Sequence, residues 1–223
     1  RTFIIGMGDY CDCITKNDPR FMVSGLAKWV TKDDVVEAQR KRIVEIFKPV
    51  SSQVLCLLAG NHEEEIHKRH DNDVIRHICD DLKVPYGGYS AFIVLTFDRR
   101  NSNESHRFVI HAWHGSGAAQ TEGARLNRLM RLVNEIEADC YLMGHLHCMT
   151  QYTPDRLIYR NGRVKSIKLA ATTTGSWLKA YNQPHEGETL NPGYAEQKGY
   201  KPSRIGCPII HIKPATSEIT VES

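Results

Sequence analysis

The sequence predicts an α/β fold, and three observations lead to this prediction. Short apolar runs rich in Ile, Val, Leu and Phe, each ended by Gly or a polar residue, are typical of buried strands in an α/β sheet. An amphipathic helical pattern separates the first two of these runs. The dipeptide Asn161-Gly162 is a strong signal for a β-hairpin. A length of 223 residues, with 41% apolar and 25% charged residues, suits a single domain over residues 1–223.

The first third of the chain reads as a parallel strand, helix and strand unit. The first strand leads to Asp9 and is followed by a variable loop. The stretch Thr31 to Asp34 supplies a Thr cap and an acidic first turn for a helix that Pro49 ends. The next strand covers residues 53–59, and the connection is expected to be a right-handed crossover. Two short helices are expected after residue 63, in EEIHKRH and DVIRHICDDL.

The remaining elements are mainly strands. A hairpin is expected at 89–97 and 107–113, followed by a helix over 120–136 that leads into the apolar run CYLMG. Further short strands are expected around the Asn-Gly turn and at 166–171, 207–213 and 218–221.

Composition and cysteine content bear on the cellular location of the protein and on the classes of partner that it binds. No apolar stretch approaches the roughly 18 residues that cross a bilayer, and nothing resembles a secretion signal. The seven cysteines form no paired framework, and Cys11 and Cys13 lack the second pair of a zinc signature. We therefore expect reduced thiols, a cytoplasmic location and no membrane partner. A net charge of +3 is too small to indicate nucleic-acid binding by itself.

Each of four apolar runs is followed by a residue that can bind a metal ion. These residues are Asp9 after FIIGMG, Asn61 after VLCLLAG, His114 after FVIHAW and His145 after CYLMG. Open α/β sheets bind ligands beyond the carboxyl ends of their strands, so we expect these side chains to converge. A set of oxygen and imidazole ligands without thiolate suits Mn, Fe or Zn.

Four motifs stand in the order found in calcineurin-like metallophosphoesterases, and the chain resembles that family over residues 2 to about 150. The stretch Gly8 to Asp12 fits GDxxD, Gly60 to Glu63 reads GNHE, His114-Gly115 fits HG, and Gly144 to His147 fits GHxH. The resemblance implies a four-layer α/β/β/α sandwich of two mixed sheets flanked by helices. It also implies hydrolysis of a phosphate ester by water that two divalent metal ions activate, with Mn favoured over Fe or Zn.

The resemblance assigns the metal ligands residue by residue. Asp9 would bridge the two metals, Asn61, His114 and His145 would complete one site, and His147 would join Asp9 at the other. The family's remaining ligands come from a DxH motif upstream of GDxxD, and this chain begins with Arg1 at the edge of the strand that leads to Asp9. We therefore expect a domain that lacks or does not show its first strand, because its N-terminus is truncated.

His62 is the expected catalytic residue, because it directly follows a metal ligand without being one. A histidine there can protonate the leaving group or stabilise the transition state. Asp12 is expected to shape the loop or support a ligand rather than bind metal itself. His111 is the alternative to His114, but only His114 is followed by Gly, which permits close backbone approach to the metals. The spacing of His145 and His147 predicts that both lie on one side of an extended segment.

Several features bear on the substrate, and each has two interpretations. Arg125, Arg128 and Arg131 share a helix face that either contacts a polyanion or is simply solvated. The segment His114 to Gly117 precedes that helix and forms either a phosphate-binding helix N-terminus or an ordinary turn. Aromatic and basic residues of the late region either face substrate or cover a second sheet; they are Trp177, Tyr181, Tyr194, Tyr200, Lys179 and Lys198.

These features slightly favour a phosphodiesterase or nuclease-like enzyme, with nucleic acid and nucleotides among the candidate substrates. One alternative is a phosphomonoesterase acting on proteins or nucleotides. Another is a mononuclear zinc hydrolase that uses only Asp9, Asn61, His114 and His145. A third is a non-catalytic scaffold subunit that keeps the fold. The sequence predicts no oligomeric state.

Overall fold

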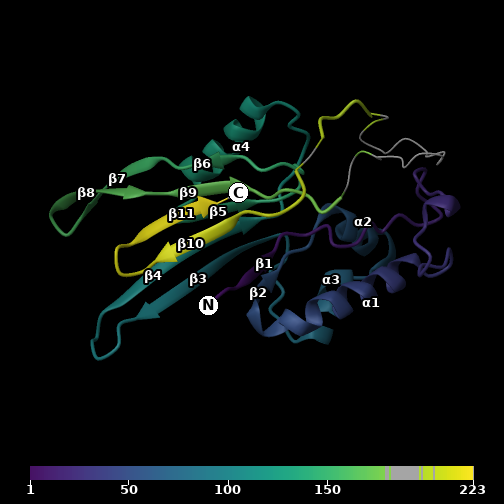
Figure 1. Ribbon diagram of the computed structural model, residues 1–223, viewed down its shortest axis with the longest axis horizontal. Coiled ribbons are helices and arrows are strands. Elements are labelled where there is room, and N and C mark those ends of the chain that lie inside the picture. The colour runs from purple at the N-terminus through teal and green to yellow at the C-terminus, as the bar shows by residue number, and fades with distance from the viewer. Residues whose placement is uncertain (179–180, 182–195, 197, 203, 223) are drawn as a thin grey trace, which may run out of the picture. The chain divides into compact units, whose positions relative to one another are not determined.

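The computed structural model describes residues 1–178, 181, 196, 198–202 and 204–222, and it is a mixed α/β structure (Figure 1). The described residues form four α-helices and several β-sheets, which confirms the predicted α/β class. The chain divides into two compact units, Arg1–Ala91 and Phe92–Ser223, called unit 1 and unit 2 below. The four-layer sandwich and the single domain remain predictions.

Unit 1 contains a pair of parallel strands joined through a helix. Strands β1 (Ile4–Gly6) and β2 (Val54–Leu57) pair in parallel, and α1 (Val35–Phe47) lies between them in the sequence. The N–H of Leu58 donates to the carbonyl of Gly6 at 3.0 Å, so the pairing continues past the end of β2. The predicted strand, helix and strand unit is thereby confirmed.

The helices of unit 1 begin at other residues than predicted. Residues 31–34 form a turn, and the first intrahelical bond of α1 runs from the Ala38 N–H to the Asp34 carbonyl at 3.0 Å. The predicted Thr31 cap is therefore wrong, because the Asp34 end of the same polar stretch begins the helix. Helix α2 (Asn61–His70) begins inside GNHE rather than after it, so the motif forms the first turn of α2.

The other elements of unit 1 complete a small core. Helix α3 (Val74–Leu82) follows α2, and two 3-10 helices, η1 (Val23–Gly25) and η2 (Lys48–Gln53), flank α1. The apolar side of α3 is buried against β2, since Ile75, Ile78 and Leu57 are fully buried in one cluster. Burial of such side chains is the main stabilising contribution to a unit of this size.

Unit 2 is built on a five-stranded sheet in the order β3-β4-β5-β9-β6. Strands β4, β5 and β9 are parallel to one another, and β6 is antiparallel to β9. Strands β3 and β4 are neighbours joined by a short turn, which confirms the predicted hairpin. The bounds are β3 (Ser90–Asp98), which begins two residues before the unit boundary, β4 (Ser105–Trp113), β5 (Cys140–Met143), β6 (Gln151–Tyr152) and β9 (Ala170–Thr173).

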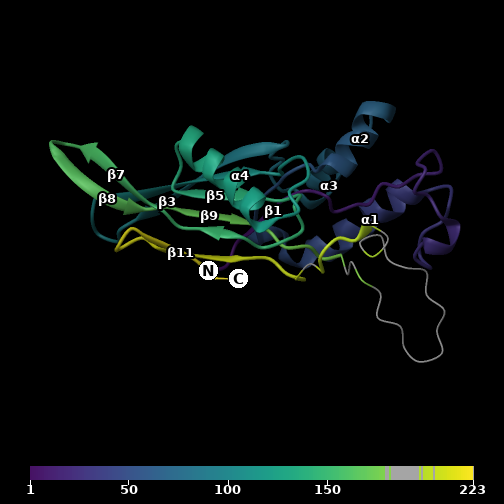
Figure 2. The same ribbon diagram turned by 90° about the horizontal axis from the view of Figure 1, so that it is seen from above.

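Helix α4 (Glu122–Glu135) covers one face of this sheet (Figure 2). Its inner side chains Leu129 and Leu132 share a buried cluster with Tyr141, Met143 and Ala171 of β5 and β9. This packing fixes the ends of β4 and β5, which carry the candidate ligands of unit 2.

Two further hairpins belong to unit 2. Strands β7 (Asp155–Arg160) and β8 (Arg163–Lys168) pair in antiparallel register around Asn161 and Gly162, whose φ angles are 53° and 75°. Two successive positive φ angles are what a type I′ hairpin turn requires, so the predicted Asn-Gly hairpin is confirmed. Strands β10 (Ile209–Lys213) and β11 (Glu218–Glu222) form the other antiparallel pair.

Two further features of the described residues concern membrane-spanning helices and the state of the cysteines. None of the helices in the described part of the chain combines the length and apolar character needed to cross a membrane. All seven cysteines are free thiols.

Candidate functional site

Asp9 follows β1 in unit 1 and lies at the N-terminus of α2. Its backbone has a left-handed φ of 56°, and its Oδ1 accepts the N–H of His62 at 3.1 Å. The N-terminal N–H groups of a helix lack partners within the helix and carry a partial positive charge, so a carboxylate is stabilised there. Gly60 is the N-cap of α2 and has no side chain to take this role. A Cβ at Gly60 would lie 2.1 Å from Oδ1 of Asp9, so the absence of that atom makes room for the carboxylate.

Glu63 ties the Asp9 loop to the start of α2. Its side chain is 2% exposed and accepts three backbone N–H groups, from Asp9 at 3.1 Å, Cys11 at 2.9 Å and Gly60 at 3.0 Å. Burial raises the pKa of Glu63 and the nearby Asp9 carboxylate raises it further, while the hydrogen bond from Cys11 acts in the opposite direction. The sequence analysis gave Glu63 no role. The sequence feature that could have identified Glu63 is a Glu at the third helical position after an N-cap, which is half of a capping box.

The His62 ring is oriented by the loop that follows Asp9. Its Nδ1 lies 2.7 Å from the backbone carbonyl of Asp12. A carbonyl can only accept, so Nδ1 carries the hydrogen and Nε2 is the nitrogen that can exchange a proton. The Asp12 side chain is exposed, and it is the backbone of this residue that contacts His62.

His62 and Asn61 line a pocket of about 690 Å³ in unit 1. Charges of both signs border it, including an ion pair between Arg20 and Asp18 at 2.7 Å. The Arg20 guanidinium hydrogen-bonds the Asp18 carboxylate and lowers the pKa of Asp18 to about 2. Tyr89 also lines the pocket, and its pKa is raised first by burial and then by the charge of Asp9.

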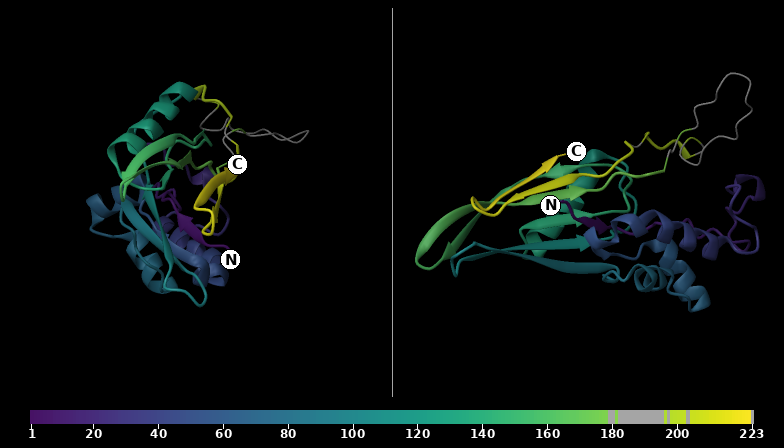
Figure 3. Two further views of the ribbon diagram at one scale, coloured as in Figure 1. Left: turned by 90° about the vertical axis from the view of Figure 1, so that its left-hand side faces the viewer. Right: turned by 60° about the horizontal axis from the view of Figure 1, so that its bottom comes forward.

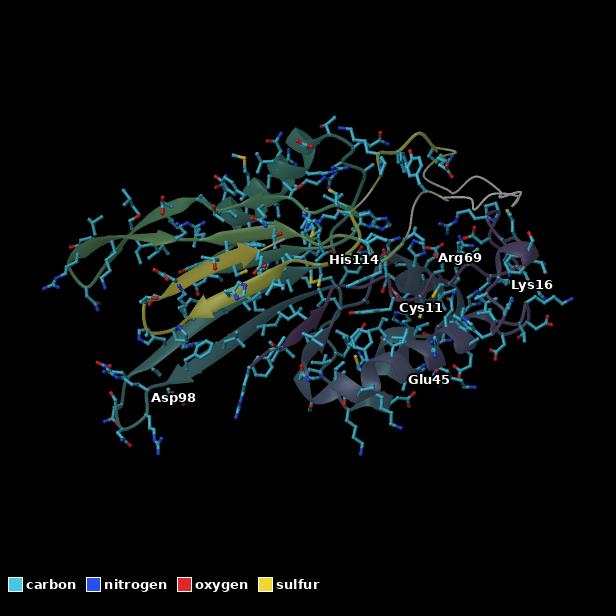
Figure 4. The ribbon with its side chains drawn as sticks, in the orientation of Figure 1. Cys11, Lys16, Glu45, Arg69, Asp98 and His114 are labelled. Atoms are coloured by element: carbon cyan, nitrogen blue, oxygen red, sulfur yellow. The ribbon has the colours of Figure 1, made fainter. Side chains whose placement is uncertain are left out.

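In unit 2, His114 and His145 lie at the ends of neighbouring parallel strands. His114 directly follows β4 and is 1% exposed, while His145 stands two residues beyond β5. Their ring centroids are 5.4 Å apart at an interplanar angle of 69°, and one ring nitrogen of each lies within 4.8 Å of the other. Figure 4 shows His114 at the opposite end of the β3–β4 hairpin from Asp98. The structure therefore brings together the two histidines that the sequence analysis had assigned to one metal.

Gly115 permits the close approach of the two strand ends. It has a φ of +100°, and a Cβ there would lie 3.0 Å from the Gly144 carbonyl oxygen and 3.1 Å from Cβ of His145. We expected this glycine to give room to the metals; within unit 2 it gives room to the end of β5.

His111, the alternative to His114, has a different environment. It is buried within β4, and its ring packs on Phe92 of β3 with centroids 4.9 Å apart. Burial lowers the pKa of His111, which favours the neutral ring. The ring of His114 packs on the ring of His145, whereas the ring of His111 packs on Phe92.

The expectation of an extended segment at His145 and His147 is wrong. Both residues have left-handed φ angles, 66° and 52°, and between them Leu146 donates its N–H to the Gly144 carbonyl at 2.7 Å. His147 is exposed. In a bent segment, a spacing of two residues no longer places both side chains on one side.

Thr173 of β9 fastens the segment that follows these histidines. Its buried Oγ1 accepts the Thr150 N–H at 2.8 Å and donates to the Cys148 carbonyl, and its own N–H donates to the Thr150 carbonyl at 2.9 Å. These bonds draw the chain back onto β9 directly after GHLH. The sequence analysis did not single out Thr173, and one Thr within a run of three carries no distinguishing signal.

Two of the three arginines on α4 brace the loop after His114. The Arg125 Nε donates to the Ala119 carbonyl at 2.9 Å, and the Arg128 guanidinium donates to the Ser116 carbonyl. Each of these two arginines is half-buried and donates to one backbone carbonyl, whereas Arg131 is exposed, and the polyanion contact stays a prediction.

The start of α4 offers limited support for phosphate binding. Thr121 caps the helix by accepting the Ala124 N–H at 3.3 Å, and Glu122 places a negative charge in the first turn. Of the late residues, Trp177 is exposed and Tyr181 donates its hydroxyl to the Tyr200 carbonyl. Lys179 and Tyr194 lie outside the described residues, so both interpretations of that region remain open.

No protein-family model, curated protein or solved structure matches this chain. The chemistry of the donors is the remaining guide. Asp9 in unit 1 and His114 and His145 in unit 2 can each offer one ligand atom to a metal ion. Carboxylate oxygen and imidazole nitrogen together suit Mn, Fe or Zn.

Proposed function

We propose that this chain is a calcineurin-like metallophosphoesterase, with the four-layer sandwich of that family, that hydrolyses phosphate esters with two divalent metal ions. One observation carries the proposal. In each unit, two parallel neighbouring strands lead into residues of two of the four motifs: β1 and β2 into Asp9 and Asn61, β4 and β5 into His114 and His145. Ligand sites at the carboxyl ends of parallel strands are the general pattern in α/β proteins.

The proposed ligands are divided between two metals. Asp9, Asn61, His114 and His145 would hold one, and His147 with Asp9 would hold the other, with Mn favoured over Fe or Zn. Two such metals, when bound, supply a lowered pKa for water and neutralise charge on the phosphoryl oxygens. The protein's part is to hold the donors in place, which Glu63 does for Asp9 and Gly115 and Thr173 do for the GHLH segment.

His62 is the proposed acid for the leaving group. Its Nδ1 is held at the Asp12 carbonyl, so the ring can deliver a proton only from Nε2. A positioned histidine of this kind contributes roughly 10²- to 10⁴-fold to turnover. We therefore expect His62→Asn to lower turnover by about that factor while the metal content stays the same. Unchanged turnover would remove His62 from the mechanism.

Metal content and turnover test the proposal together. The protein is reconstituted with Mn, its metal is measured by elemental analysis, and hydrolysis of p-nitrophenyl phosphate and bis(p-nitrophenyl) phosphate is followed. We expect two metals per chain and faster turnover of the diester, and we expect His114→Ala and His145→Ala each to lose metal and activity. His106→Ala is the matched control, since His106 is exposed on β4.

Each other result selects an alternative. Monoester turnover without diester turnover indicates a phosphomonoesterase. A single bound zinc with turnover indicates the mononuclear hydrolase. Absence of both metal and turnover in the reconstituted protein contradicts the proposal and favours the scaffold subunit.

A further inference from the structure

The β7–β8 hairpin carries the positive charge of the chain. Residues 155–168 contain five basic residues and one acidic residue, a formal net charge of +4, although the whole chain carries only +3. The rest of the protein is therefore slightly acidic. A basic segment of this density is the electrostatic footprint of a polyanion site.

Three basic side chains of the hairpin are accessible. Arg163, Lys165 and Lys168 are exposed, and none of the described acidic residues forms an ion pair with them. Arg156 differs, because its guanidinium donates to the Val133 carbonyl of α4 and so anchors the base of the hairpin.

The hairpin also exposes an apolar face with an aromatic ring. Tyr159 and Val164 are a cross-strand pair, and with Leu157 they lie on the same side of the ribbon. These three side chains are 76%, 67% and 74% exposed. The basic residues Arg163 and Lys165 lie on the other side, by the alternation of the strands.

The ribbon stands apart from the sheet of unit 2. Within the described part of the chain, β7 and β8 pair only with each other. Figures 1, 2 and 3 agree that the hairpin extends beyond the ends of the neighbouring strands of unit 2. Two-stranded ribbons are marginally stable alone, and an exposed ribbon of this kind is typical of a surface that contacts a partner.

We propose that the β7–β8 hairpin is a nucleic-acid-binding arm, separate from the candidate metal site. Arginine and lysine would contact the phosphates, and Tyr159 offers a flat ring on which an unpaired base can stack. A two-stranded ribbon also fits the roughly 12 Å width of a DNA major groove. Charge complementarity to a phosphate chain, together with an aromatic ring on the opposite side of the same ribbon, favours nucleic acid over an acidic peptide, which offers no base to stack.

The distance between the arm and the histidine segment sets a length requirement. From Gly162 through β8 and β9 to Thr173 the chain runs 11 residues, which spans at most about 35 Å when extended. A strand of about ten nucleotides covers that length, at 3.4 Å per nucleotide. If the proposed phosphodiesterase function also holds, the bound strand is its substrate, and about ten nucleotides are the most that it needs to reach from the arm to the histidine segment.

Binding is measured by fluorescence anisotropy on the whole protein in EDTA, which prevents metal-dependent cleavage. The probes are a fluorescein-labelled single strand of 30 nucleotides and a 30-base-pair duplex. The test variant is Arg163→Glu with Lys165→Glu. The control is Lys28→Glu with Lys32→Glu, which makes the same change in net charge at two exposed residues of unit 1. Thermal melting followed by circular dichroism checks that all variants stay folded.

We expect the arm variant to bind at least about tenfold more weakly and the control to bind nearly as the unaltered protein does. Replacing Arg163 and Lys165 by Ala should lower the slope of log affinity against log salt by about two. Tyr159→Ala should weaken single-strand binding about tenfold and duplex binding much less.

Any one of three results would overturn the inference. The first is that the unaltered protein binds neither probe at low salt, and the second is that the arm and control variants lose equal affinity. The third is that poly-glutamate competes for the protein as well as nucleic acid does. The assay contains no metal, so its failure leaves the proposed hydrolase untouched. Conversely, failure of the metal and turnover assays leaves the binding arm untouched.

Discussion

The two units present candidate ligands in the same way but hold them by different means. In both, the residues follow neighbouring parallel strands. In unit 1 the Asp9 loop is held by the buried side chain of Glu63, which accepts three backbone N–H groups. In unit 2 the segment after His145 is held by the neutral hydroxyl of Thr173 and by the close approach at Gly115.

This difference changes how each unit should respond to substitution. A buried carboxyl with three donors directed at it leaves three unpaired donors when it is removed, and unpaired buried groups are expensive. Removing a hydroxyl that accepts one hydrogen bond and donates one leaves only two hydrogen-bonding groups unpaired. Unit 1 should therefore be more sensitive than unit 2 to loss of the side chain that holds its candidate ligands.

Glu63→Gln should have the largest effect. The amide keeps one acceptor oxygen but directs an NH₂ group at backbone N–H donors, so we expect unfolding free energy to fall by about 3 kcal/mol. Urea unfolding monitored by circular dichroism measures this. Glu64→Gln is the control, because the Glu64 carboxylate is half-exposed and lies 3.8 Å from His67 and 3.7 Å from Lys68. It should change stability by less than about 1 kcal/mol. Equal losses in both variants would contradict the role given to Glu63.

Gly60→Ala should have the next largest effect, and it also acts on the Asp9 loop of unit 1. The new Cβ would overlap Oδ1 and the backbone nitrogen of Asp9, at 2.1 and 2.2 Å, so the loop must move. We expect a loss of about 2 kcal/mol and weaker metal binding by the reconstituted protein. Gly123→Ala is the matched control, since Gly123 lies within α4 with open space around it. That variant should be stabilised by about 0.5 to 1 kcal/mol.

The features that were predicted correctly from the sequence are those that depend on residues adjacent in the chain. The Asn161-Gly162 turn forms because two adjacent residues tolerate positive φ, and no distant contact is needed. The strand ends before His114 and His145 were also predicted, because an apolar run followed by Gly or a polar residue identifies a buried strand. The start of α1 was predicted incorrectly, because Thr31 and Asp34 are both residue types that cap helices. Which of them begins the helix depends on the folded conformation of the loop.

What the sequence did not reveal depends on contacts between distant residues. Glu63 bonds to Asp9 across 54 positions, and Thr173 bonds to Thr150 across 23. Local patterns contain no trace of such pairs. The bonds to Thr173 hold residues 148 and 150, directly after the His145 to His147 segment, which spacing alone had predicted to be extended. The roles of Arg125 and Arg128 were missed for this reason as well, because their partners are carbonyls of the preceding loop.

Thr173→Val should have the smallest of the three effects and so completes the comparison. Valine keeps the shape but removes the acceptor for the Thr150 N–H and the donor to the Cys148 carbonyl. We expect a loss of about 1 to 2 kcal/mol, less than for Glu63→Gln, and faster amide hydrogen exchange at residues 145–150. Thr96→Val on an exposed position of β3 should change stability by less than about 0.5 kcal/mol. If Thr173→Val instead proves as costly as Glu63→Gln, then the number of unpaired backbone groups does not explain the difference between the two units. Packing around the fully buried Thr173 would then be the better explanation, since its surroundings would not tolerate even a side chain of equal volume.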